Sequence, residues 1–474
     1  MNCHSRRIIM NRNASLLVTV GFLLCCTVMS SPAQDKGNVL LDLLLKKGTI
    51  TQAEADTVKA EWDNQLTAQV AALDKTKVAG WIQEMKWFGD LRVRIDFTDN
   101  EDQSSQVDRW RYRFRLRFGL ETKFTDWAQL GLRLASGGED PVGTNQTLQD
   151  TFSHKPISID QAYVTLQPPG RDWVKVTGGK MPNPIWQTSV ASPMVWDHDV
   201  TPEGVAEQLS FKFGDKQQHR LFVNFGQFIL DEISADSNDP YLLEFQAGAQ
   251  AKIGSAKLTT AAGYYQTFNL AGMGVASGSQ PVGAATPAAQ STSGNRGNAT
   301  AQPGGTGTTL YYLDDFQVVY GRSEIAVTVA AKPFLGTPAV VTLSGEYLHN
   351  VTKAHETLHR STQTVAPDQT DGWTGQIAFG SAKKQGEWQV AYQYKYLEAD
   401  ATWDAISDSD WGLGGTDRRG HVFKGSYQMR DWWQFAFTAL LTEKISDRPN
   451  NSENTRGQRG EELLKVEMDT VFKF

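Results

Sequence analysis

The sequence predicts an all-β protein, a transmembrane antiparallel β-barrel of about 16 strands, preceded by a signal peptide and a short α-helical periplasmic segment. Three observations predict this fold class. Apolar and polar residues alternate along most of the chain, and the connections between these alternating stretches are short and long in turn. Aromatic residues make up 10% of the chain although its mean hydropathy is only −0.41. A barrel reconciles these two values, because only every second residue of a strand faces lipid.

Residues 1–33 have the three parts of a secretory signal peptide. The segment begins with three arginines, continues with an apolar run over 16–29, and ends in small residues at 31–33. The apolar run is roughly 15 residues long, shorter than the ~20 that a membrane-spanning helix needs. We therefore expect export and cleavage rather than a retained anchor helix.

The cysteines and the charge balance exclude several classes of protein. Cys3, Cys25 and Cys26 all lie in the signal, and Leu24 before Cys25 is too large for a lipoprotein signal. The mature chain would have no disulfide, no thiolate nucleophile and no cysteine metal site. Without the three signal arginines it has 43 basic and 53 acidic residues, a net charge of −10, which argues against a nucleic-acid partner. We expect no metal and no cofactor.

Residues 34–80 form the predicted periplasmic helical segment. Thr51 and Glu54 have the spacing of a capping box, in which each side chain accepts a hydrogen bond from the other residue's amide. The helix after this box has an apolar stripe at three- or four-residue steps. The stripe can pack on the preceding short helix or form a coiled coil with copies of itself. It consists of Ala55, Val58, Trp62, Leu66, Val70 and Leu73.

The barrel domain is expected over residues 81–474, and its clearest strand lies at 109–120. A strand places alternate residues on opposite faces. In a membrane barrel one face meets lipid and the other a watery lumen, whereas in a soluble sandwich one would be core. The apolar face is Trp110, Tyr112, Phe114, Leu116, Phe118 and Leu120. The expected pore-lining face is Arg109, Arg111, Arg113, Arg115 and Arg117.

The same alternation predicts fifteen further strands. Their ranges are 91–97, 127–135, 157–167, 173–181, 205–213, 219–229, 241–253, 256–268, 310–332, 339–350, 372–382, 387–398, 419–429, 432–445 and 461–474. Short polar turns such as 254–255 alternate with longer loops such as 136–156, as periplasmic turns and extracellular loops do. The loop at 269–309 is rich in Gly, Ala, Ser, Thr, Gln and Pro, so we expect it to be a mobile surface loop.

The last strand ends the chain at Phe474. A terminal aromatic residue on an alternating strand resembles the signal by which outer-membrane barrels are recognised for assembly. We therefore expect outer-membrane lipid and the barrel-assembly machinery as partners, and the bacterial outer membrane as the location.

Three stretches resemble the bacterial putative porin family. They are LLDLLLKKGTITQAEA at 40–55, DQAYV at 160–164 leading to GGKMPNP at 178–184, and VWDHDVTPEGVA at 195–206, which is the most specific. The resemblance implies a signal, a helical extension and a barrel of roughly 16 strands. It also implies a water-filled channel for passive diffusion of small hydrophilic solutes or ions, and it supplies no catalytic residues, so we expect no enzyme.

Asp197, His198, Asp199 and Glu203 form the densest cluster of acid–base and metal-ligating residue types. They could hold a cation or act as paired carboxylates. They could also belong to a loop whose carboxylates bind backbone amides. A third hypothesis places Asp197, Asp199 and Glu203 in a loop that folds into the lumen and constricts it opposite the arginines.

The arginine row also has two interpretations. Rings of arginine in a pore wall favour anions, which predicts a channel with some anion preference. Alternatively, the arginines pair with carboxylates on neighbouring strands and stiffen the wall. Two other functions stay open from the sequence, an outer-membrane barrel enzyme with an unrecognised site and a secreted soluble β-rich carbohydrate-binding protein. A homotrimer is possible but not required.

Overall fold

The computed structural model describes residues 45–61, 82–99, 108–138, 140–234, 237–273, 297–298, 300–301, 311–352, 369–412, 414–446 and 460–474. The expected signal peptide at 1–33, four of the six residues of the helical stripe and most of the 269–309 loop lie outside these residues. The chain divides into two compact units, Met1–Gly80 and Trp81–Phe474. None of the described helices is long and apolar enough to cross a membrane.

The first unit contains a helix over residues 52–61. The predicted capping box begins it. The Thr51 amide donates to the Glu54 carboxylate at 2.7 Å, and the Glu54 amide donates to the Thr51 hydroxyl at 3.3 Å. These two bonds satisfy amides that the first turn of a helix leaves unpaired.

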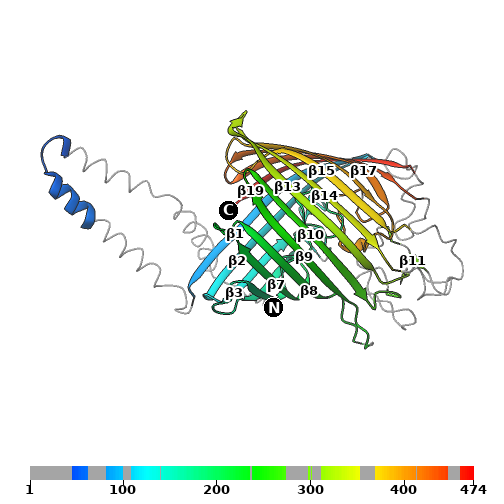
Figure 1. Cartoon of the computed structure of the whole chain (residues 1–474). Coiled ribbons are helices and arrows are strands. Elements are labelled where there is room, and N and C mark those ends of the chain that lie inside the picture. The colour runs from blue at the N-terminus through cyan, green and yellow to red at the C-terminus, as the bar shows by residue number, and fades with distance from the viewer. Residues whose placement is uncertain are drawn as a thin grey trace, which may run out of the picture. The chain divides into compact units, whose positions relative to one another are not determined.

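The second unit is a closed antiparallel barrel of sixteen long strands (Figure 1). The strands are β1 (Glu84–Asp99), β2 (Arg109–Thr125), β3 (Ala128–Ser136), β5 (Ile157–Leu166), β6 (Val174–Lys180), β7 (Glu203–Phe213), β8 (His219–Ile229), β9 (Tyr241–Ile253), β10 (Ala256–Phe268), β13 (Gln317–Phe334), β14 (Thr337–Asn350), β15 (Asp371–Gly380), β16 (Trp388–Leu397), β17 (Arg418–Arg430), β18 (Trp433–Lys444) and β19 (Glu462–Lys473). Neighbours in the chain pair with one another, and β1 pairs with β19. The wall therefore has no free sheet edge.

Three two-residue strands and one turn of 3₁₀ helix are not among the sixteen barrel strands. The two-residue β4 (Gln146–Thr147) pairs with β2, and β11 (Thr300–Ala301) pairs with β12 (Tyr311–Tyr312). The 3₁₀ turn η1 (Asp404–Ile406) lies in the connection between β16 and β17.

Several strand boundaries differ from the predicted ones: β1 begins at Glu84, ahead of residue 91, and β2 extends to Thr125, beyond residue 120. The strand expected at 310–332 begins at Gln317 and runs to Phe334. The chain turns just before it, because the Asp315 carboxylate accepts the Leu270 amide at 2.8 Å and the Thr267 amide donates to the Phe316 carbonyl at 2.9 Å. These contacts hold residues 313–316 against the end of β10 and delay the start of the strand.

The two faces of β2 are those that the sequence predicts. Trp110 and Tyr112 on the outer face are 58% and 54% exposed, whereas Arg115 on the opposite face is 8% exposed. The outer aromatic rings pack across strands, as Trp87 of β1 does on Phe118 with ring centroids 5.2 Å apart. A two-sheet sandwich is excluded, because a single sheet closes on itself and its outer face is apolar.

Candidate functional site: the constricted interior of the barrel

The arginines of β2 pair with two aspartates of the neighbouring strand β1. Arg111 contacts Asp96 at 2.8 Å, and Asp90 contacts both Arg115 at 2.9 Å and Arg117 at 2.7 Å. The antiparallel register sets these pairs, because Asp96 lies opposite Arg111 and Asp90 lies opposite Arg117. Arg113 lies farther from the Asp96 carboxylate, at 3.5 Å, and Arg109 at the strand end is exposed.

The chain between β6 and β7 folds into the barrel, and we call residues 181–202 the inward segment. Most of its hydrophobic residues are buried, among them Met194, Val195 and Trp196. The inward segment is attached to the inner side chains of five strands in turn. The Trp186 amide donates to Gln246 of β9 at 2.9 Å. The further contacts are Ser189 with Glu324 of β13, Thr188 with Glu346 of β14, Ala191 with Gln376 of β15 and Ser192 with Gln393 of β16.

The far end of the inward segment meets the arginine row. The Asp199 carboxylate contacts Arg115 at 3.2 Å and Arg117 at 3.5 Å. Burial alone would raise the pKa of the Asp199 carboxyl, but Arg115, Arg92 and Arg117 hold it below its ordinary value. The inward segment thus completes the network of Asp90, Arg115 and Arg117.

Asp197 plays a different part from Asp199. Its carboxylate accepts the amides of Asp199 and Ser409, both at 2.8 Å. Burial, followed by the nearby charges of Asp199 and Asp408, raises the pKa of the Asp197 carboxyl well above its ordinary value. This is the loop role in which carboxylates bind backbone amides. No group of three or more His, Cys, Asp or Glu in the described part of the chain is arranged to hold a metal ion.

Glu203 lies away from this cluster. It is the first residue of β7 and contacts Lys180 of β6 at 2.8 Å, with 62% of its side chain exposed. Glu203 lies opposite Lys180 in the strand register, on the face that Val205 shares. The structure therefore places Asp197 and Asp199 inside the barrel, but not Glu203.

The connection between β16 and β17, described over 398–412 and 414–417, also contributes side chains to the interior. The Asp410 carboxylate contacts Arg94 of β1 at 3.0 Å and Lys465 of β19 at 2.6 Å. Burial acts to raise the pKa of Asp410, but Lys465 and Arg94 hold it well below its ordinary value. Trp411 beside it is fully buried. Asp408 contacts Ser192, so this connection also holds the inward segment.

Sequence reasoning missed most of the residues that build this interior. Gln246, Gln376 and Gln393 carry no recognisable motif, and their role depends on segments that are far apart in the chain. Their one signal is position, because each is a polar residue on the inward face of an alternating strand. Asp90 and Asp96 were foreseen only as unnamed carboxylate partners of the arginines.

The comparisons with known proteins bear on this architecture. The model of a family described as putative porin matches residues 96–455, well over half of the chain. The chain belongs to the putative porin family. Membership in this family indicates a channel-forming barrel of the outer membrane, and the resemblance seen in the sequence is confirmed. A comparison with curated proteins found no match.

Solved structures of other outer-membrane barrels are similar to this putative porin. The trimeric, in-vitro folded form of OmpT, an outer-membrane protein of Vibrio cholerae, has 11% identity and a TM-score of 0.45, over 82% of this chain and 99% of that one. A mutant of the Rh. blastica porin has 9% identity and a TM-score of 0.40, over 82% of this chain and 100% of that one.

Proposed function

We propose that this putative porin is a non-enzymatic channel for passive diffusion of small hydrophilic solutes and ions through the outer membrane. The contact between Asp199 and Arg115, 3.2 Å apart, carries this proposal. It places charged groups of an inward-folded segment against charged groups of the wall. A hydrophilic solute that passes this constriction exchanges part of its hydration for these fixed charges, as in other selective pores.

The orientation follows from the connections. Short turns such as 254–255 lie at one end of the barrel, and the longer connections, such as 398–417, lie at the other. Outer-membrane barrels have short turns on the periplasmic side. We therefore assign the short-turn end to the periplasm, which is consistent with export by a cleaved signal at 1–33.

We propose that the channel prefers anions, and that cations outside the arginine row produce this preference. The arginines of β2 are largely balanced by Asp90, Asp96 and Asp199. A second set of cations lies on the inward faces of five neighbouring strands near the short-turn end, and none of them forms an ion pair with the carboxylates that the structure describes. This set, the periplasmic cations, is Lys175, Lys212, Arg220, Lys252 and Lys257.

Conductance in a planar bilayer with a salt gradient tests the channel and its ion preference together. We expect stepwise single-channel currents and a reversal potential on the anion-selective side. A protein that migrates as a heat-modifiable barrel and inserts into the bilayer but gives no conductance would contradict the proposal. Hydrolytic activity without conductance would favour a barrel enzyme instead.

We also propose that the barrel associates with copies of itself through the outer face of β6, β7 and β8. Polar side chains interrupt the apolar face there: Lys180 pairs with Glu203 at 2.8 Å, and Gln227 donates to Glu207 at 3.2 Å. Charged side chains on a lipid-facing surface are costly, so a second copy covering this face would stabilise them. A homotrimer would satisfy this requirement, and light scattering of the purified protein tests it. A monomer at all concentrations would contradict self-association.

A further inference from the structure

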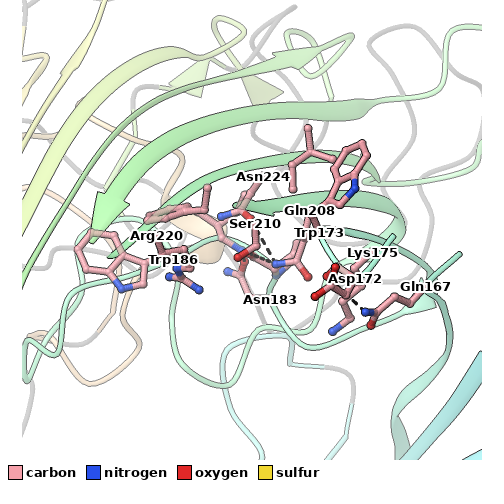
Figure 2. Close-up of a pocket in the computed structure, with 14 residues that line it drawn as sticks. Gln167, Asp172, Trp173, Lys175, Asn183, Trp186, Gln208, Ser210, Arg220 and Asn224 are labelled. Carbon is pink, nitrogen blue, oxygen red and sulfur yellow. Dashed lines mark hydrogen bonds between the residues drawn. The ribbon is translucent and has the colours of Figure 1, made fainter. Parts of the chain in front are cut away.

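A cavity of about 400 Å³ lies between the inner face of β6, β7 and β8 and residues 183–186 of the inward segment (Figure 2). It lies close to the short-turn end, because its lining includes Gln167 and Asp172 of the β5–β6 connection. This volume is within the range of small-molecule binding sites, near its lower limit. The cavity therefore suits a solute of about the size of a monosaccharide.

The lining of this cavity is rich in hydrogen-bonding groups. Two cations, Lys175 and Arg220, and four amides line it: Gln167, Asn183, Gln208 and Asn224. Figure 2 shows Asp172, Lys175 and Gln167 together on one side, and Asn183, Arg220 and Trp186 on the other. Such a set can bind a carboxylate and several hydroxyl groups at once, because amides both donate and accept hydrogen bonds.

Several of these groups are held in place by other parts of the protein. The Gln208 Nε2 donates to the Pro184 carbonyl at 2.9 Å and to Asn224 at 3.3 Å. Trp186 is fixed by two backbone bonds with Gln246, each 2.9 Å. A site whose groups are already ordered loses less conformational entropy when a solute binds.

Two buried donors in the lining have no acceptor among the residues that the structure describes. The Asn183 Oδ1 accepts the Ile185 amide at 2.9 Å, which leaves the Asn183 Nδ2 without a partner. The Arg220 Nε also has no partner, although the guanidinium lies 4.7 Å from the centre of the Phe222 ring. Buried donors without acceptors are costly, so a small side-chain shift that brings the two donors to acceptor oxygens of a solute would be favourable.

The charges at this end of the barrel also favour an anion. Lys212 lies directly opposite Arg220 in the β7–β8 register, so two like charges face the same space. Neither Lys175 nor Arg220 forms an ion pair with any carboxylate in the described part of the chain. The one acidic residue of the lining, Asp172, can accept hydrogen bonds from hydroxyl groups of a solute.

We propose that this cavity is a binding subsite for a monosaccharide-sized hydroxylated carboxylate, a sugar acid. Arg220 and Lys175 bind the carboxylate, the amides and Asp172 bind the hydroxyl groups, and Trp186 contacts the apolar face of the carbon chain. The subsite deepens the proposed channel function and rests on it, because the solute reaches the cavity through the lumen. Binding here raises the local concentration of sugar acids at the periplasmic end of the channel.

Calorimetric titration of the full-length protein in detergent micelles with D-gluconate tests the subsite. D-glucose has the hydroxyl groups without the charge, and acetate has the charge without the hydroxyl groups. We expect gluconate to bind at least about tenfold more tightly than either, since a charge-assisted hydrogen bond is roughly twice as strong as a neutral one. Equal affinity for gluconate and glucose, or for gluconate and acetate, would overturn the proposal.

Two matched variants separate a specific site from a general effect of positive charge. Arg220→Gln removes a cation that lines the cavity, whereas Lys257→Gln removes one on the same inner face, two strands away on β10. We expect about a tenfold loss of gluconate affinity for Arg220→Gln and less than about twofold for Lys257→Gln at physiological salt, where free charges are screened. Equal losses would contradict a site. If Arg220→Gln does not fold into a heat-modifiable barrel, Lys175→Gln replaces it with the same expected loss.

Conductance of the same preparations in potassium chloride tests the channel function separately from the subsite. A conducting protein that does not bind gluconate overturns the subsite and leaves the channel intact. A protein that binds gluconate but does not conduct overturns the channel and supports the binding site.

Discussion

The Asp199 carboxylate lies 3.2 Å from the Arg115 guanidinium and 3.5 Å from that of Arg117, and so joins the inward segment to strand β2. The three side chains are largely buried, with exposed fractions of 9–19%. Loss of one partner would leave a buried charge uncompensated. The free-energy cost of that uncompensated charge is larger than the net stabilisation that the intact pair provides.

We predict that Asp199→Asn destabilises the barrel by about 3 kcal/mol and raises the single-channel conductance, because the freed end of the inward segment no longer narrows the lumen. Thermal unfolding and bilayer recordings measure the two effects. Glu84→Gln is the matched control, since its solvent-exposed pair with Lys123 contributes little to stability. Unchanged conductance in Asp199→Asn would show that this contact does not set the pore width.

The charge cluster around Asp410 predicts resistance to acid. Lys465 and Arg94 hold the pKa of Asp410 well below its ordinary 3.8. The charged Asp410 carboxylate therefore contributes its full stabilisation of the folded state above pH 3.8. It is lost only as the pH falls through the lower folded-state pKa. Asp410→Asn should therefore be less stable than the native protein at pH 4 as well as at pH 7, and the difference should vanish only at a pH well below 4. A difference that has already vanished at pH 5 would contradict this assignment.

The closure of the barrel predicts a sensitive glycine. Gly89 and Phe474 exchange two backbone hydrogen bonds, of 2.9 and 3.1 Å. A Cβ atom at Gly89 would clash with the Arg117 carbonyl oxygen and would lie 2.5 Å from the Phe474 ring. We predict that Gly89→Val sharply lowers the fraction of heat-modifiable, folded barrel on gels. Gly425→Val should fold normally, because a Cβ atom there meets no atom within 4 Å. Equal yields would show that the barrel closes without a glycine at position 89.

The ion preference predicts different outcomes for the two sets of cations. The triple variant Lys175→Gln, Lys212→Gln and Arg220→Gln should shift the reversal potential toward cations, because it removes charges that no described carboxylate balances. The double variant Arg111→Gln and Asp96→Asn removes a 2.8 Å pair without changing the net charge of the wall, and its shift should be small. A larger shift for the double variant would place the ion preference in the arginine row.

Much of the wall could be predicted from the sequence. Strands β8, β9 and β10 begin and end at the predicted residues, because one face of each meets an apolar surface and the alternation is strict. The charge pairs could not be predicted, since the partner of Arg115 depends on the register between β1 and β2, and a period of two does not specify register. Glu203 and Asp199 are close in sequence, which groups them in the prediction. However, β7 begins at Glu203, and the alternation along this strand directs the Glu203 side chain outward, like that of Val205.

The interior was less predictable than the wall. The inward segment has no regular period, and its contacts join residues as distant as Ser192 and Gln393. The amides of the cavity come from strands and turns that meet only in the folded barrel. Composition and spacing do not predict such sites. In the sequence each amide is only one more lumen-facing residue, and the residues that complete the site lie on other strands.

The attachments of the inward segment also constrain the order of assembly. This stretch precedes β9, β13, β14, β15 and β16 in the chain, yet it contacts a side chain of each. The inward-facing side chains of these five strands therefore meet these partners only once the inward segment lies inside the barrel. Shortening the inward segment would remove these partners. We expect slow or misaligned pairing of β1 with β19 to be the first effect, before any change in the solutes that the folded pore admits.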